Sequence, residues 1–248
     1  MDELVNAYGR VMPIDGQKVV DPNYEYFFGS DGGNYEASYI KLLGESNKRF
    51  LTYGEYISDT NRIIHRVASD PRLCNLLKGS FFRLLLPKQI FSSYSEMLDK
   101  LYLPALRDVV INKFSAEKFV LPENFLDSVS LVESSRQEYF LRLLSRNSMA
   151  AIYFPTAFYG YSYVASREMM RHLPKNLVLS GAIEVVQTLI AYPNLLQIGR
   201  SPFMDMAACQ LDGHSISLGM DSLSSFKIEL RDESPNPIHA GGLLVIDD

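Results

Sequence analysis

The pattern of hydrophobic and polar positions changes character near residue 148 of this chain. From residue 34 to 148, apolar residues recur at the three- and four-residue spacing of a helix face, for example at Ile57, Ile64, Val67 and Ala68. Beyond residue 148, aromatic and β-branched residues become more frequent between turn residues, which is typical of strands. The pattern therefore predicts helices first and strands afterwards.

Three of the expected helices begin with the same local signal, a Ser or Thr followed three positions later by Glu. In such a capping box, each side chain accepts a hydrogen bond from a backbone N–H group of the other residue. The pairs are Thr52 with Glu55, Ser93 with Glu96, and Ser135 with Glu138. Pro104 lacks an N–H group, so we expect it to kink or split the second helix.

A two-residue turn at Asp212-Gly213 predicts a hairpin in the second part of the chain. Its expected register pairs Leu211 with His214, Gln210 with Ser215 and Cys209 with Ile216, so Cys209 does not lie directly opposite His214. We therefore interpret Cys209 as a buried structural residue rather than as a nucleophile paired with His214. Residues 226–231 alternate between apolar and charged, which predicts a strand with Lys227 at a solvent-facing or rim position.

Together these signals predict an α+β fold. An irregular segment rich in Gly, Pro, Asp and Asn covers residues 1–33, a helical region covers residues 34–148, and a β-rich region covers residues 149–248. We expect the β-rich region to form a mostly antiparallel half-barrel or cone, with one short helix at residues 166–172 packed against it.

The composition argues against several function classes. The 248 residues carry a formal net charge of −5, so there is no basic field that would attract nucleic acid. Cys74 and Cys209 lie far apart and the four histidines are scattered, so we expect no disulfide framework, no metal site and no cofactor. The sequence has no signal-like or membrane-length apolar run, so a cytoplasmic location without membrane contact is expected, although delivery by a secretion system would leave no visible signal.

Two segments that begin like catalytic or binding motifs lack a residue that their chemistry needs. The glycine-rich loop at residues 29–33 is followed by Asn34 instead of the lysine of a phosphate-binding loop. The segment 160–164 begins like a nucleophile elbow around Ser162, but Val164 stands where that motif requires glycine. We therefore assign no catalytic residue from either segment.

The aromatic tract from Phe158 to Tyr163 fits a pocket wall. If the tract is extended, Tyr159, Tyr161 and Tyr163 share one face, and three phenols can line a pocket that is apolar in its body and polar at its tips. The same pattern also fits a tyrosine ladder on a sheet face that packs beneath a helix.

The order of elements between about residues 150 and 242 resembles the opening half of the acetoacetate decarboxylase family. In that family an aromatic strand is followed by a helix ending in Leu-Pro, a second strand and a segment of the type Gly-Pro-Tyr-x-Glu. The similar segments here are residues 158–164, 166–174, 183–189 and 199–206, and residues 236–242 resemble the approach to the family's Schiff-base lysine. The resemblance places Phe203 and Asp205 at the family's aromatic and carboxylate positions. Because no lysine follows residue 242, it implies a pocket without the decarboxylase chemistry.

From these observations we expect a non-catalytic protein that binds a small molecule, for instance a small organic acid, in a pocket of the C-terminal sheet. The expected walls are Tyr159, Tyr161, Tyr163 and Phe203, and the expected polar contacts are Arg200 and Asp205. The main alternative is a protein–protein interaction or regulatory module, such as a bacterial effector, whose helical region docks a partner. An enzyme of unrecognised class is the third hypothesis, because catalytic groups drawn from distant segments leave no sequence signal.

Overall fold

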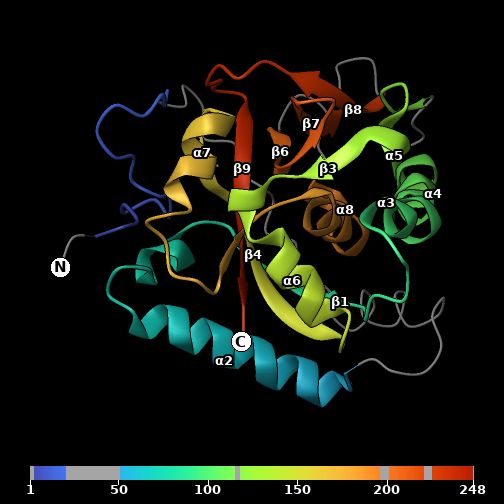
Figure 1. Ribbon diagram of the computed structural model, residues 1–248. Helices are drawn as coiled ribbons and strands as arrows, with labels where there is room; N and C mark the ends of the chain where they lie inside the picture. Colours follow the sequence, from blue (N-terminus) through green and yellow to red (C-terminus); the bar gives the residue numbers. More distant parts are fainter. Residues whose placement is uncertain (1–2, 21–50, 115–117, 196–200, 221–224, 248) are drawn as a thin grey trace.

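Helices surround one large β-sheet in the computed structural model, which describes residues 3–20, 51–114, 118–195, 201–220 and 225–247 (Figure 1). The strands are β1 (Phe82–Leu86), β2 (Phe119–Val120), β3 (Val129–Leu131), β4 (Met149–Tyr159), β5 (Leu177–Leu179), β6 (Phe203–Leu211), β7 (His214–Met220), β8 (Phe226–Arg231) and β9 (His239–Ile246). The α-helices are α2 (Tyr53–Ser69), α3 (Tyr94–Met97), α4 (Leu103–Phe114), α5 (Phe125–Ser128), α6 (Gln137–Leu144), α7 (Tyr163–Met169) and α8 (Ala182–Ala191). This confirms the predicted α+β class.

The sheet is mixed and open. Its strands follow the order β1-β4-β9-β6-β7-β8-β2, with β3 beside β6 and β5 beside β9. The pairs β6–β9 and β2–β8 are parallel, and the other described pairs are antiparallel. The described strands do not close into a barrel.

Strands from both parts of the chain form this sheet. β1, β2 and β3 come from the region that the sequence predicts as helical, and β1 pairs with β4 from Phe82 opposite Tyr153 to Leu86 opposite Met149. The run Phe82–Leu86 is short and almost wholly apolar, and periodicity alone cannot distinguish such a run from part of a buried helix. The sheet therefore crosses the boundary that we expected near residue 148.

Two of the three capping signals mark helix starts as predicted. Thr52 and Glu55 form a complete capping box at the start of α2. At the start of α3, Ser93 Oγ accepts a hydrogen bond from the Glu96 N–H at 3.0 Å. These local contacts fix where each helix begins without help from distant residues.

The two remaining helix signals are Pro104 and the third capping pair, Ser135 with Glu138. A π-helical turn, Leu98–Tyr102, separates α3 from α4 just before Pro104, as expected for a residue that cannot donate a backbone hydrogen bond. The third capping box is not formed. Ser135 Oγ accepts from the Gln137 N–H instead, and Arg136, with a φ of 65°, occupies the position before α6.

The aromatic tract is not one extended segment, which corrects the prediction that its tyrosines share a face. β4 ends at Tyr159, Gly160 has a φ of 79°, and Ser162 caps α7, which begins at Tyr163. A Cβ atom at Gly160 would lie 2.1 Å from the carbonyl oxygen of Val20, so this sharp bend needs glycine. The bend starts the short helix three residues earlier than the sequence indicates.

Residues 183–189, expected as a strand, lie in α8. The polar residues Glu184, Gln187 and Thr188 have helical spacing, but every side chain from Ala182 to Ile190 is buried, so the helix has no solvent-exposed polar face. Its start is fixed by Glu184, whose Oε2 accepts a hydrogen bond from the Gly181 N–H at 2.8 Å.

The predicted hairpin is confirmed at its turn. The turn Asp212-Gly213 has φ values of 48° and 83°, and Leu211 pairs with His214. Further along, the register shifts between Asp205 and Gln210, which interrupts the simple pairing that we expected for Cys209. Cys209 is buried and His214 is exposed, so the two do not form a catalytic pair.

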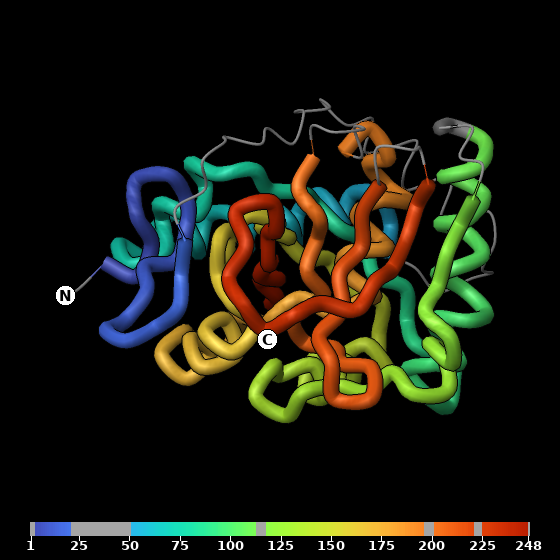
Figure 2. Tube along the Cα trace, turned by 90° about the horizontal axis from the view of Figure 1, so that it is seen from above, coloured from blue at the N-terminus to red at the C-terminus, as the bar shows by residue number. Residues whose placement is uncertain are grey.

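Two hydrophobic clusters fill the two sides of the sheet. One packs α8, α4 and α6 against the sheet and includes Val186, Leu106 and Met204. The other joins α2, α7 and the N-terminal segment to β4 and β9. Figure 2 shows the N-terminal segment (blue) beside α7 (yellow), where Gln17 Nε2 donates a hydrogen bond to the Ala165 carbonyl at 3.2 Å. α7 is thus held over one face of the sheet.

The longest described helix, α2, has 17 residues and carries charged side chains on its exposed side. In the ranges that the structure describes, we find no helix with the length and apolar character needed to cross a membrane.

Candidate functional site

Four neighbouring strands, β9, β6, β7 and β8, carry polar side chains on the face that α7 covers. Alternate residues of these strands point the other way, into the cluster around α8: Met204, Leu218 and Ile228. Their sequence neighbours Asp205, Ser217 and Glu229 pair across β6, β7 and β8, so they share the opposite face. This polar face brings together residues from distant parts of the chain.

Asp205 is the centre of a buried hydrogen-bonded network. Its Oδ1 accepts a hydrogen bond from Tyr163 Oη at 2.9 Å and lies 2.8 Å from His239 Nδ1. Burial, together with the Asp205 charge, raises the pKa of Tyr163, so its hydroxyl stays protonated and donates. Because a carboxylate only accepts hydrogen bonds, His239 Nδ1 carries the proton in this contact.

The second ring nitrogen of His239 has a different environment. His239 is only 2% exposed, and in the described part of the structure its Nε2 has no hydrogen-bond partner. In a neutral imidazole with a proton on Nδ1, Nε2 is an acceptor with a free lone pair. The network therefore holds a buried ring nitrogen that no described residue satisfies.

The His239 ring is also held by stacking. The Phe203 ring lies parallel to it, with centroids 5.0 Å apart and an angle of 17° between the planes. Phe203 in turn lies against Gly219, where an added Cβ atom would come within 2.4 Å of the ring. Lys227 Nζ lies 5.8 Å from the centroid of the Phe203 ring and 2.8 Å from Glu229 Oε2. This end of the polar face thus combines a fixed imidazole, an aromatic ring and a pair of opposite charges.

Arg167 anchors α7, and with it Tyr163, to the sheet. Its guanidinium donates to the carbonyl oxygens of Ala207 at 2.9 Å and Cys209 at 3.1 Å, and to Ser215 Oγ at 3.3 Å. The two carbonyls belong to the part of β6 where the register shifts. Burial lowers the pKa of Arg167, but a guanidinium stays charged at any ordinary pH. Arg167 therefore satisfies backbone groups that the irregular strand leaves open.

The structure brings together three of the six residues that we predicted to bind a ligand: Tyr163, Phe203 and Asp205. Tyr159 Oη donates to the Pro237 carbonyl, and Tyr161 Oη donates to the Val11 carbonyl, both at 2.9 Å. These two tyrosines bind backbone groups of neighbouring segments and do not join the Asp205 network. Arg200 lies outside the described residues.

Sequence reasoning missed His239 as a member of the site. In the sequence it is one of four scattered histidines, 34 positions beyond Asp205, and only the parallel pairing of β6 with β9 places Phe203 opposite His239. Its segment, residues 236–242, stands out in the sequence only through the family resemblance. A contact made by a parallel crossover has no local sequence signal.

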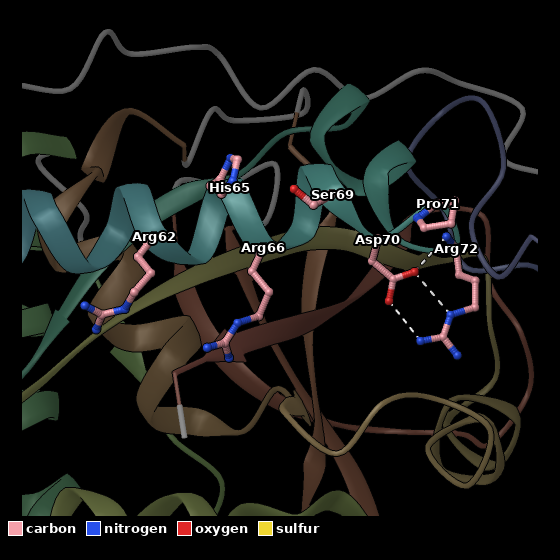
Figure 3. A pocket seen from close by; sticks show the side chains of 7 residues that line it. All are labelled: Arg62, His65, Arg66, Ser69, Asp70, Pro71 and Arg72. Atoms are coloured by element: carbon pink, nitrogen blue, oxygen red, sulfur yellow. Dashed lines mark hydrogen bonds and ion pairs between the residues drawn. The ribbon is translucent and has the colours of Figure 1, made fainter.

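Two surface hollows lined by described residues lie along α2, away from the polar face. The larger, of about 680 Å³, is drawn in Figure 3. There Arg62 and Arg66 point to one side of α2 and His65 points to the other, while Asp70 binds Arg72 at 2.9 Å. Arg62 and Arg66 are also paired with Asp247. The side chains of this hollow diverge and its main cations have carboxylate partners, so we place the candidate site at the Asp205 network.

Other residues with chemical potential have structural roles. Cys209 Sγ lies 3.2 Å from Tyr94 Oη and 3.3 Å from the Ala182 N, and burial raises the pKa of its thiol to about 12. It is a buried structural residue, as the sequence predicts. Among the described residues, no group of three or more His, Cys, Asp or Glu side chains is arranged to hold a metal ion.

Comparisons with protein-family models, curated proteins and solved structures gave no match for this chain. The acetoacetate decarboxylase resemblance is therefore still a hypothesis, and function has to be argued from the site.

Proposed function

We propose that the protein binds a small organic acid at the end of the polar face formed by His239, Asp205, Phe203 and Lys227. The observation that carries this proposal is the enclosed His239 Nε2, an acceptor without a partner in the described structure. A buried polar atom without a partner costs about 1–3 kcal/mol, and among the buried atoms without a described partner, Nε2 is the only histidine nitrogen. A ligand with a hydrogen-bond donor would remove this cost.

The neighbouring groups fit the rest of such a ligand. The Asp205 side chain is 7% exposed and His239 is 2% exposed, so the network is enclosed. Phe203 offers an apolar surface, and the ammonium group of Lys227 is available to a carboxylate that competes with Glu229. Lys227 is 31% exposed, which agrees with its predicted rim position and keeps its charge accessible. A small acid with a hydroxyl group, or with a C–H group made acidic by a neighbouring carbonyl, would present a proton to His239 Nε2.

The alternative of a protein–protein interaction module lacks a comparable observation. The most exposed large apolar side chains among the described residues include Ile90 (76%), Tyr8 (67%) and Leu230 (50%). They belong to different segments: a loop, the N-terminal segment and β8. Scattered apolar residues of this kind are normal on protein surfaces.

The proposal can be tested by NMR on protein whose histidines are labelled with ¹⁵N. Lactate, pyruvate and acetoacetate are added in turn. We expect the ring nitrogen signals of His239 to shift with at least one acid, while those of the exposed His214 stay in place. The same acid at about 100 times its dissociation constant should stabilise the fold by about 2.7 kcal/mol. Replacing Lys227 by Met should weaken binding, whereas Lys175→Met, at an exposed position on another loop, should not. If none of the acids moves the His239 signals, the proposal is wrong.

A further inference from the structure

The hydrogen bonds around His239 determine which of its nitrogens can accept a proton. His239 Nδ1 donates its proton to Asp205 Oδ1 at 2.8 Å, and the Tyr163 hydroxyl donates to the same oxygen. This leaves the lone pair on Nε2, which is enclosed and has no partner among the described residues. A histidine whose orientation is fixed at one nitrogen by a carboxylate has the arrangement of a general base at the other.

The surroundings of His239 would stabilise the charge that proton uptake creates. When Nε2 takes a proton the ring becomes an imidazolium, and the Asp205 carboxylate is already in contact with it. Stacking on Phe203 restrains rotation of the ring, and Tyr163 holds the carboxylate in place. Neither partner has to move during the transfer, which is what makes a fixed electrostatic environment effective.

We propose that His239 is a general base that removes a proton from the bound acid, with Asp205 and Tyr163 as positioning residues. This inference rests on the binding site proposed above and adds a reaction to it. The substrate class is a small acid with a C–H bond next to a carbonyl group. That C–H bond breaks, its proton passes to Nε2, and its electron pair forms an enolate, whose negative charge is stabilised by the imidazolium that forms beside it. Return of a proton from the imidazolium to the same carbon closes the cycle without any oxidant or reductant.

The test uses pyruvate as the probe, with the whole protein dissolved in D₂O. While the enolate is bound, the proton on Nε2 exchanges with D₂O, so a deuteron returns to the carbon and proton NMR follows the reaction as the loss of the methyl signal. We expect exchange well above the rate in buffer alone. His239→Gln, which keeps an N–H donor for Asp205, should reduce the exchange about 10²-fold or more, because general-base catalysis contributes about 10²–10⁴-fold. His214→Gln, at an exposed position of the hairpin, is the matched control and should exchange at the wild-type rate.

Asp205→Asn separates a positioning role from a merely structural one. An amide can donate to Nδ1, which would move the ring proton to Nε2 and block the lone pair that the reaction needs. We expect slower exchange together with ¹⁵N ring signals that report a proton on Nε2. Slower exchange with the original tautomer would overturn the positioning role.

The outcomes distinguish this inference from the binding proposal. If pyruvate shifts the His239 signals but its methyl protons exchange only at the buffer rate, the general-base role is wrong and binding stands. If His239→Gln exchanges within twofold of the wild type, the general-base role is also wrong. If pyruvate neither shifts the His239 signals nor exchanges its methyl protons, it does not bind at His239, and the general-base role is wrong as well. Urea unfolding of each variant shows whether a loss of exchange reflects a loss of fold.

Discussion

Arg136 offers the sharpest test of how this fold is held together. Its guanidinium donates hydrogen bonds to four backbone carbonyl groups in the connection from α7 to β5, those of Met170, Leu173, Pro174 and Leu177. The bonds to Leu173 and Leu177 measure 2.8 and 2.9 Å. Burial lowers the pKa of this guanidinium, which remains charged at ordinary pH. One side chain thus ties the start of α6 to the end of the helix that carries Tyr163.

The substitution Arg136→Met removes these hydrogen bonds and leaves the conformational free energy of the positive φ at position 136 unchanged. Position 136 has a φ of 65°, and methionine is as unfavourable there as arginine. A hydrogen bond to a charged group contributes about 1.5–3 kcal/mol, and the four bonds are not additive because Arg136 is only partly buried and water can reach some of the carbonyls. We therefore expect a loss of about 2–4 kcal/mol in the free energy of unfolding, more than one such hydrogen bond and less than the sum of four.

Urea unfolding of the wild type and three variants checks this value. Arg136→Lys keeps the charge but not the planar set of donors, so its loss should be intermediate. Arg146→Met, at an exposed position just after α6, should change the stability by no more than about 0.5 kcal/mol. A loss below 1 kcal/mol for Arg136→Met would refute the reasoning, because the four carbonyl groups would then not depend on this guanidinium.

Three further predictions concern single side chains. Cys209 should not react with a thiol reagent in the folded protein, because burial raises the pKa of its thiol to about 12, whereas the partly exposed Cys74 should react; reaction of both thiols at equal rates would contradict this. Burial raises the pKa of Glu184 above 4.5, so its contribution to stability is fully present below about pH 4.5 and is lost as the pH rises through the raised value. Urea unfolding between pH 4 and 8 should therefore show a smaller decrease in stability with rising pH for Glu184→Gln than for the wild type. Parallel curves of stability against pH for the two proteins would contradict the raised pKa of Glu184. Gly213→Val should destabilise the hairpin by about 1–2 kcal/mol or more because of the φ of 83°, while Gly54→Val, in the first turn of α2, should cost less; equal losses in thermal unfolding would argue against the turn.

The sequence by itself determined the elements whose signals are local. Thr52 and Glu55 mark the start of α2 because a capping box needs only one turn of chain. The turn at residues 212–213 follows from the preference of Asp-Gly for positive φ, and the strand at residues 226–231 follows from its alternation. These features allowed the α+β class to be predicted. The same local reasoning placed Cys209 in the interior.

Only the tertiary structure decided the features that depend on burial and on distant pairing. α8 is buried on all sides, including its polar residues Glu184 and Thr188, and only the packing shows that these polar groups lie in the interior. Ser135 lost its capping role because Arg136 turns into the left-handed region, where its guanidinium reaches the end of α7. Sequence reasoning included Asp205, Phe203 and Tyr163 in the site, but the contact of Asp205 with His239 exists because β9 returns parallel to β6. Such a pairing is selected by the packing of the whole sheet, and no segment of the chain encodes it alone.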